Sequence, residues 1–409
     1  MFGEGWLVAI GLLLLASTLA RDALLFLIAL TLILATLIAR WWYRHCLDRV
    51  EYRRSFSHRR AFFGEEVELT VEIVNRKLLP LAWLETEDEI PRELTPLHGT
   101  TMPSHKPARA LLMNFLSLRW YERVRRHYRI VCAARGEHEF GPARMRSGDV
   151  FGFEAQEVDL DKRDYLLVYP KVVPITRLGL PPRDPFGDRR TRDWLFEDPL
   201  NAVGVREYAS GDSPRRIHWK ATARTQQLQV KLYEPTTTHR LVVFLNLNTL
   251  GESWSLRYDP DLVELAITAA ASVASWAAEQ GYQVGLSANG FMYRSGPGPA
   301  RAAPSRDPEQ LTHVLEVLAR ALPFASFPLE DLLRRESQEL PYGATLVVVT
   351  AVLNAPIAAE LVALRRAGHR VALLLVGDGQ ADVHLPGVPI YPIGGTGAWR
   401  ELAELAVGG

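Results

Sequence analysis

The chain has 409 residues, enough for two or three domains with separate hydrophobic cores. Lysine plus arginine and aspartate plus glutamate number 47 each, so the formal net charge is zero, which argues against a protein that binds nucleic acid over its whole surface. The two cysteines, Cys46 and Cys132, lie far apart without a CxxC spacing. This arrangement supports neither a disulfide framework nor a thiolate zinc site.

Two apolar runs open the chain. Trp6–Ala20 and Ala23–Ala39 contain almost no polar residues and are separated by Arg21 and Asp22. Each run is close to the lower limit of roughly 17–25 residues for a helix that spans a bilayer. One continuous helix would place both charges in the middle of the bilayer, which is costly. The sequence therefore predicts a transmembrane helical hairpin over residues 1–45.

The basic residues near these runs predict the orientation. They follow the second run, at Arg40, Arg44, Arg49, Arg53 and Arg54. Because positive charge stays on the cytoplasmic side, we expect a protein of the cell (inner) membrane with its soluble body in the cytosol. A cleaved signal peptide fits less well, since no basic segment precedes the first run; an exported body stays the alternative.

A β-rich region is expected over residues 55–150. The stretch EEVELTVEIVN alternates, with Val67, Leu69, Val71 and Ile73 on one face. Short strands with turn signals between them favour a small antiparallel sandwich. A basic stripe is interpreted as a solvated strand face, with contact to anionic lipid as the alternative; it consists of Arg123, Arg125, Arg126 and Arg129.

Residues 151–238 are expected to form a linker and a basic segment, and residues 239–409 an α/β domain. Strands alternate with helices in this second half, which predicts a mostly parallel, doubly wound sheet. A helix is expected after residue 258, with Asp259 or Asp261 as its cap, and another over AWRELAEL at residues 398–405. Asn289-Gly290 predicts a tight hairpin turn into FMYRSG. Ligands of such sheets bind where strands end, here at Asn246–Thr249, Thr350–Asn354 and Gly377-Asp378.

Motifs of common chemistry are missing from the sequence. There is no GxxxxGK[ST], no HExxH and no GxSxG, so the chain offers no signature of a P-loop, a zinc protease or an α/β-hydrolase. The stretch GGTGAW could present amides to an anion at the start of a helix, although such a turn is usually only a turn.

One segment does carry a specific pattern, GVREYASGDSPRRIHWKATARTQQLQVKLYEP at residues 204–235. It closely resembles the signature of the family called domain of unknown function fifty-eight. The matching positions are Arg206, Glu207, Tyr208, Gly211, Asp212, Arg216, Ile217, Trp219, Lys220, Ala223 and Arg224. The order of a membrane hairpin, a β-rich segment, this signature and a von Willebrand factor A-like domain is also similar to that family.

The resemblance implies a bacterial, membrane-anchored accessory protein without a settled reaction. It implies a MoxR-type AAA+ ATPase as partner and, in some relatives, a transglutaminase-like membrane protein. It further implies a von Willebrand factor A-like fold, which often holds Mg²⁺ after its first strand. The matching positions here are Asn246, Asn248 and Thr350, without a carboxylate, so we expect no tight Mg²⁺ site and no cofactor.

Physically, the signature predicts a turn at Gly211-Asp212, a short helix capped by Asp212 or Ser213 and entered through Pro214, and then a strand with Leu228, Val230 and Leu232 inward. Three interpretations compete. The segment could be a structural joint with Trp219 buried against the α/β domain, a docking surface in which clustered arginines, Arg215 included, meet an acidic partner, or an enzyme site that uses Asp212, His218 and Lys220.

We favour the joint with an adjacent docking face. The expected function is a membrane-anchored adaptor that works through protein–protein contact. The alternative is a metal- or phosphate-dependent enzyme at the strand ends of the α/β domain.

Overall fold

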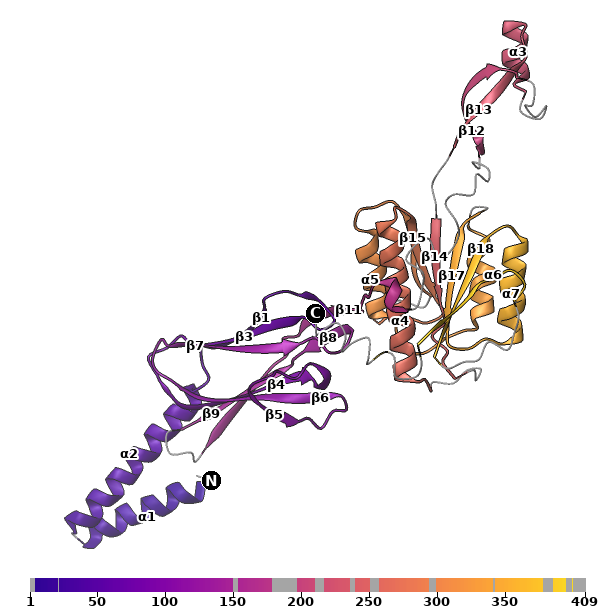
Figure 1. The fold of residues 1–409 in the computed structure, drawn as a ribbon. Helices are drawn as coiled ribbons and strands as arrows, with labels where there is room; N and C mark the ends of the chain where they lie inside the picture. Colours follow the sequence, from indigo (N-terminus) through magenta and orange to yellow (C-terminus); the bar gives the residue numbers. More distant parts are fainter. Residues whose placement is uncertain are drawn as a thin grey trace. The chain divides into compact units, whose positions relative to one another are not determined.

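The computed structural model describes residues 4–20, 22–149, 154–178, 197–209, 217–235, 240–250, 257–293, 299–340, 343–377, 385–394 and 399 (Figure 1). The chain divides into two compact units, Met1–Lys171 and Val172–Gly409.

The first unit begins with two apolar helices, α1 (Glu4–Ala20) and α2 (Ala23–His45), which pack on each other. Asp22 starts α2, because its carboxylate accepts hydrogen bonds from the amides of Leu24 and Leu25 at 2.9 and 3.4 Å. By length and composition α2 could span a bilayer, with a mean hydropathy of 2.5. Helix α1 is shorter, with 17 residues against 23 in α2. The expected pair of helices is therefore present, and α2 is the stronger candidate for a membrane span.

Strands fill the rest of this unit. They are β1 (Val50–Phe56), β2 (Arg60–Phe62), β3 (Glu66–Asn75), β4 (Leu81–Pro91), β5 (Thr100–Pro103), β6 (Arg109–Leu118), β7 (Arg123–Val131), β8 (Gly136–Phe140), β9 (Ala143–Gly148), β10 (Ala155–Leu160) and β11 (Asp164–Tyr169), with a 3-10 turn η1 (Arg92–Leu94). Sheets in the orders β1-β3-β7 and β10-β9-β4-β6-β5 face each other, and a third has the order β2-β11-β8.

The core of the β-rich unit is built from residues of all three sheets. The alternation predicted for β3 is confirmed, since Val67, Leu69, Val71 and Ile73 are all buried. The unit also extends further along the chain than residue 150. The stretch after residue 164, expected beyond the β-rich region, forms β11, which pairs with β8 and with β2. These long-range pairings leave no local signal in the sequence.

A buried charged cluster crosses this core and consists of Tyr52, Arg54, Asp88 and Asp164. The Arg54 guanidinium donates to the carboxylates of Asp88 and Asp164, the latter at 3.2 Å, and Tyr52 donates to Asp88 at 2.6 Å. Arg54 and Asp88 have no exposed side-chain surface. Burial raises the pKa of Asp88 to about 6, and the attraction of Arg54 only partly opposes this.

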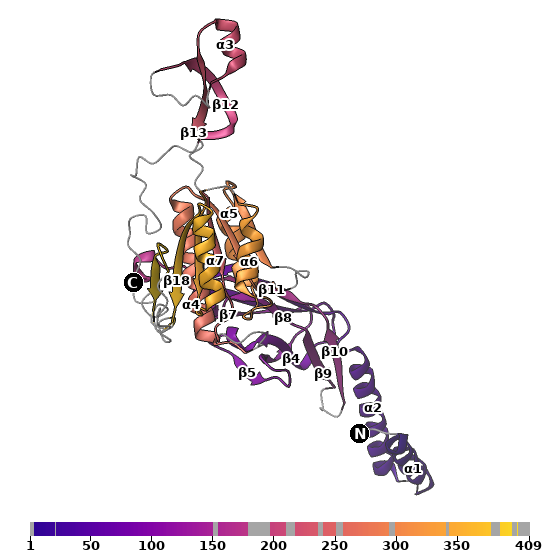
Figure 2. The same ribbon diagram turned by 90° about the vertical axis from the view of Figure 1, so that its right-hand side faces the viewer.

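The second unit contains a six-stranded sheet in the order β16-β15-β14-β17-β18-β19. Figure 2 shows β18 of this sheet with α4, α6 and α7 around it. Its strands are β14 (Arg240–Leu245), β15 (Gln283–Ala288), β16 (Ala300–Ser305), β17 (Thr345–Thr350), β18 (Arg370–Val376) and β19 (Ile390–Ile393). All neighbours pair in parallel except β15 and β16, as expected for a mostly parallel sheet. Within the described residues, four helices surround it: α4 (Pro260–Glu279), α5 (Gln310–Arg320), α6 (Leu329–Ser337) and α7 (Ala355–Arg366).

The helices cover both faces of this sheet. Leu332, Leu333 and Leu361 of α6 and α7 pack on Phe244 and Val348, while α4 packs on the other face with α5 beside it. Helix α4 is also long and apolar enough to cross a membrane, but 72% of its apolar window is buried, as expected of a core helix. Asp259 caps α4 through the amides of Asp261 and Leu262, so of the two caps predicted from the sequence, Asp259 and Asp261, the first is confirmed.

Two further elements differ from expectation or lie outside the described residues. Asn289-Gly290 does not turn the chain directly into a second strand, so the predicted tight hairpin is wrong. The strand that pairs with β15 is β16, ten residues further on, and the Asn289 side chain is buried inside the domain. Of the helix expected over residues 398–405, the structure describes only Trp399.

The same unit also contains a 3-10 turn, η2 (Ile175–Leu178), and the segment formed by β12 (Glu197–Glu207), α3 (Trp219–Thr225) and β13 (Gln229–Pro235). We call this last segment the signature hairpin (Figure 1).

Candidate functional site

The signature hairpin is a two-stranded antiparallel ribbon with a short helix on it. Its register pairs Glu207 with Gln229 and Arg206 with Val230. Ile217 forms a bridge to Val230, and the next amide, that of His218, donates to the Gln229 carbonyl at 2.7 Å. The path of the chain before and after α3 is therefore fixed by backbone hydrogen bonds.

Helix α3 begins later than the sequence predicted. Asp212, Ser213 and Pro214, expected at its start, lie outside the described residues, and the N-cap is His218. One nitrogen of the His218 ring accepts from the amide of Ala221 at 3.0 Å. Histidine is not among the usual capping residues, so a search for serine, threonine, aspartate or asparagine misses this start.

A side chain of α3 locks the helix to the ribbon. The Thr222 hydroxyl accepts from the Gln229 amide at 3.0 Å. After the helix, Gln226 adopts a left-handed conformation with φ of 55°, and β13 begins three residues later. Because the connection from α3 to β13 is short and Thr222 bonds to β13, the helix is held close to that strand.

The surface of this hairpin is apolar and basic. Trp219 is 68% exposed, so the burial expected for a joint is not found. Leu228 is also exposed and Gln229 is buried, which reverses the predicted faces at these two positions, while Val230 is buried as predicted. Lys220 and Arg224 are exposed on the same short helix.

The signature residues fall into two groups. The structure brings together Arg206, Glu207, Tyr208, Trp219, Lys220 and Arg224 on the hairpin, whereas Gly211, Asp212, Arg215 and Arg216 lie outside the described residues. Of the three residues considered for an enzyme site, His218 is engaged as a helix cap.

A second polar group lies at the carboxyl ends of β14, β15 and β17, and we call it the strand-end network. It consists of Asn246, Asn289 and Thr350, which are 3%, 0% and 0% exposed. Asn246 donates to the Thr350 hydroxyl at 2.9 Å, and Asn289 donates to the Asn246 side-chain carbonyl at 2.8 Å. Asn289 had not been singled out from the sequence as a partner, although it follows its strand as directly as Asn246 follows β14.

The rest of the network is bonded to backbone. Asn289 accepts from the Leu247 amide at 2.8 Å and donates to the Phe327 carbonyl at 3.0 Å. The side-chain carbonyl of Asn246 also accepts from the backbone amide of Asn248 at 3.0 Å, and the Thr350 hydroxyl donates to the Val352 carbonyl at 2.7 Å. The oxygen atoms that a metal would use are thus engaged with amides, and the network itself carries no formal charge.

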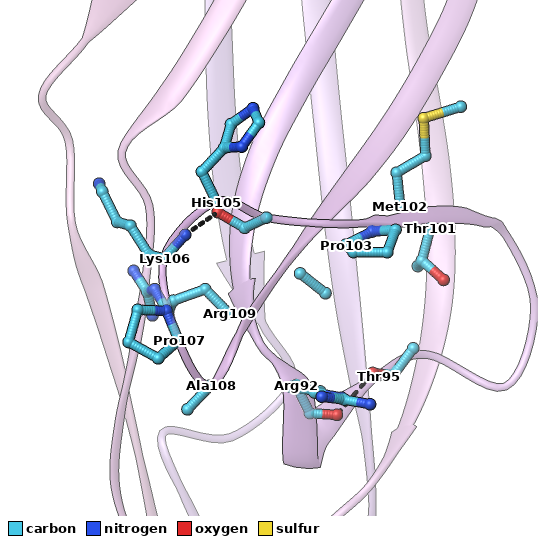
Figure 3. Close-up of a pocket in the computed structure, with 12 residues that line it drawn as sticks. Arg92, Thr95, Thr101, Met102, Pro103, His105, Lys106, Pro107, Ala108 and Arg109 are labelled. Carbon is cyan, nitrogen blue, oxygen red and sulfur yellow. Dashed lines mark hydrogen bonds between the residues drawn. The ribbon is translucent and has the colours of Figure 1, made fainter.

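The β-rich unit has an open pocket at the end formed by β5 and the start of β6 (Figure 3). Its basic side chains are Arg92, His105, Lys106 and Arg109. Lys106 pairs with Glu89 at 2.8 Å, and Arg109 donates to the carbonyls of Glu139 and Gly141. Two of these four basic side chains, Lys106 and Arg109, therefore already bond to groups of the protein.

Comparison with known proteins links the signature hairpin to the α/β domain. Residues 204–395 match the family model described as "Protein of unknown function DUF58". This range begins in the hairpin and ends in the last strand region, so the family resemblance drawn from the signature residues is confirmed over a little under half of the chain. The description of this family names no reaction.

A curated relative covers more of the molecule. The chain is 24% identical over 332 residues to "Uncharacterized protein YeaD" of Bacillus subtilis (strain 168), an alignment that spans 78% of this chain and 74% of that protein. Among solved structures, a cohesin module of Clostridium perfringens covers 29% of this chain and 95% of its own, with 11% identity and a TM-score of 0.20. A cohesin of Archaeoglobus fulgidus covers 30% and 91%, with 10% identity and a TM-score of 0.21. Scores this low carry no argument about fold or function.

Proposed function

We propose that the protein is a membrane-anchored adaptor that docks a cytosolic AAA+ ATPase of the MoxR type through the signature hairpin. The observation that carries this proposal is the exposed Trp219 beside Lys220 and Arg224 on a short, internally fixed helix. The family resemblance supplies the identity of the partner, and α2, with its apolar length, supplies the anchor.

The composition of the hairpin surface suits a docking role. Large apolar side chains at a surface cost free energy until a partner covers them. Tryptophan, tyrosine and arginine dominate the binding energy of protein interfaces. The hairpin exposes Val205, Tyr208, Trp219 and Leu228 together with basic side chains. A partner with an apolar pocket and an acidic rim would satisfy both parts of this surface.

The fixed geometry of the hairpin supports the same conclusion. The His218 cap and the Thr222 contact to Gln229 hold α3 on the ribbon before any partner binds. A surface that is ordered in advance loses less conformational entropy on association. The basic cluster beyond α2 orients the soluble body towards the cytosol, where an ATPase has its nucleotide.

The proposal is tested by purification of the full chain from its native membrane. Wild-type protein should retain an ATPase, and Trp219→Ala should lose most of it, because one central aromatic residue can contribute 2 kcal/mol or more, about a thirtyfold change in affinity. The charge variant Lys220→Glu with Arg224→Glu should act mainly on the association rate and its salt dependence.

The matched control is Phe115→Ala in β6. Phe115 is 68% exposed, the same fraction as Trp219, but lies in the β-rich unit. Phe115→Ala should leave the complex with the ATPase intact. If an ATPase stays bound to the Trp219→Ala and charge variants as firmly as to wild type, the hairpin is not the docking face; if none is retained by wild type, the adaptor proposal itself fails.

A further inference from the structure

Helix α2 ends inside the β-rich unit. Cys46 and Leu47, directly after α2, are buried in the core of the sandwich, and Trp42 packs against the same core. The Lys77 ammonium donates to the backbone carbonyls of Cys46 and Asp48, the latter at 2.6 Å. A cation at the carboxyl end of a helix is favourable, so Lys77 fastens the turn after β3 to the end of α2.

Two loops lie at this end of the sandwich, and we call them the α2-proximal loops: residues 76–80 between β3 and β4, and residues 119–122 between β6 and β7. The strand register pairs Val50 with Asn75, Val74 with Arg123, and Leu81 with Leu118. The start of β1, directly after α2, therefore lies at the same end as both loops.

Hydrogen bonds join the two loops to each other. The Asn75 side-chain amide donates to the carbonyls of Leu79 and Arg119, both at 2.9 Å. The Tyr121 amide donates to the Lys77 carbonyl at 3.2 Å. The loops therefore form one surface, which is tied to the end of α2 through Lys77.

This surface is unusually apolar for a pair of loops. Leu78 is 72% exposed, and Trp120 and Tyr121 are each 64% exposed. Basic residues flank them at Arg76, Arg119 and Arg123; Arg76 pairs with Glu51 at 2.7 Å and Arg123 with Glu72 at 3.8 Å, and the Arg119 side chain is exposed. Tryptophan and tyrosine concentrate at the interface between lipid tails and water, where an apolar ring and a polar edge are both satisfied, and basic side chains there attract anionic headgroups.

The length of α2 brings this surface to the level of the headgroups. The apolar run ends at Ala39, seven residues before Cys46, a rise of about 10 Å at about 1.5 Å per residue. The headgroup region on each side of a bilayer is roughly 5–8 Å thick. Loops that contact Cys46 through Lys77 lie near its outer boundary, and exposed Leu or Trp side chains bridge the remaining few ångströms.

We propose that the α2-proximal loops rest on the lipid surface from which α2 emerges, with Leu78, Trp120 and Tyr121 in the interfacial layer and Arg119 on anionic headgroups. This inference relies on the membrane anchoring in the proposed function. The β-rich unit then has two attachments to the bilayer, α2 and this surface, and its tilt relative to the membrane is restricted.

Lipid contact is measured on the full chain in vesicles of zwitterionic and anionic lipid, without any other protein. An environment-sensitive fluorophore is attached at Leu78→Cys and, as a matched control, at Met102→Cys. Met102 is also an exposed apolar side chain, 51% exposed, but β5 pairs with the far end of β6. Both native cysteines are buried. Wild type treated with the same fluorophore checks that these two cysteines are not labelled.

At position 78 the emission should shift to the blue, and a quencher carried by the lipid should remove most of it. At position 102 neither effect should occur. Adding Trp120→Ser and Tyr121→Ser to the labelled Leu78→Cys chain should weaken the quenching, and omitting anionic lipid should weaken it less.

Two results would overturn the proposal, and flotation of the chain with the vesicles distinguishes them. If the chain floats but position 78 behaves as position 102 does, the loops do not contact lipid and only this inference fails. If the chain does not float with lipid, the anchoring in the proposed function fails as well.

Discussion

The charged cluster of the β-rich unit and the strand-end network of the α/β domain both bury polar side chains, but only the first carries formal charges. Arg54 and Asp88 offset each other's cost of leaving water, so neither can be removed alone. Asn246, Asn289 and Thr350 are neutral. Each hydrogen bond among them replaces hydrogen bonds that the same groups make to water in the unfolded chain. Equal burial therefore does not mean equal contribution to stability.

The largest effect is expected for Arg54→Met. The variant leaves the Asp88 carboxylate buried beside one tyrosine hydroxyl, and loss of one partner of a buried pair typically costs about 3–5 kcal/mol. Hydrogen exchange at the β3 and β4 amides of the full chain measures this loss in its own unit.

The neighbouring residue offers a control for this variant. Arg53 pairs with Glu51 at 2.8 Å but its side chain is 56% exposed, so Arg53→Met should change exchange little. Equal protection factors in the Arg53 and Arg54 variants would show that the charged cluster is no more important than a surface pair.

The charged cluster should also give a pH dependence that the neutral network lacks. Burial raises the folded-state pKa of Asp88 from 3.8 to about 6, so the folded state holds this proton more tightly than the unfolded state does. The contribution of Asp88 to stability is therefore greatest below about pH 4 and decreases as the pH rises from about 4 to 6.

Comparison of wild type with Asp88→Asn isolates this contribution from that of other carboxylates. The difference in exchange between the two proteins should change over this range and be flat above it. A difference that is constant from pH 4 to 6 would mean that Arg54 keeps Asp88 ionised throughout.

A smaller effect is expected for Asn289→Ala. The change leaves the Leu247 amide and the Phe327 carbonyl without their side-chain partner, and a buried group left unsatisfied costs about 1–3 kcal/mol. Exchange at the β14 and β15 amides should increase. Asn248→Ala is the control, because Asn248 is less buried than Asn289 and its side chain accepts a longer bond of 3.2 Å from the Leu250 amide.

The contrast between these clusters also explains what the sequence could predict. Alternation in β3 and the cap at Asp259 are local, so they were predicted and confirmed. Arg54 and Asp88 are 34 positions apart, and only the strand register brings them together. Asn289 was misread because Asn-Gly after a strand is the strongest short hairpin signal, and nothing local reveals that its amide turns inward.

The signature segment also shows that a sequence pattern can be specific without predicting the local structure. Its residues resemble a family signature, and residues 204–395 match the model of that family, but their order did not predict how the segment folds. The helix start depends on His218, and Trp219 is exposed because the residues of one short helix cannot cover a side chain of that size. Recognition of a motif and derivation of its geometry are separate inferences.

The smallest effect is expected from Mg²⁺. Asn246 accepts two hydrogen bonds and donates a third within the strand-end network, so a cation would have to replace amides with no carboxylate from the network to offset its dehydration. Thermal unfolding of the full chain in detergent should have the same midpoint in Mg²⁺ as in a chelator. A cation present at about 100 times its Kd would add about 2.7 kcal/mol to the free energy of unfolding, so a site with such a Kd would raise the unfolding midpoint measurably. If Mg²⁺ raises the midpoint in wild type but not in Asn246→Ala, the network is a metal site whose amides rearrange on binding. The strand-end network would then hold a charge when the ion is bound, and it would no longer be the neutral counterpart of the charged cluster.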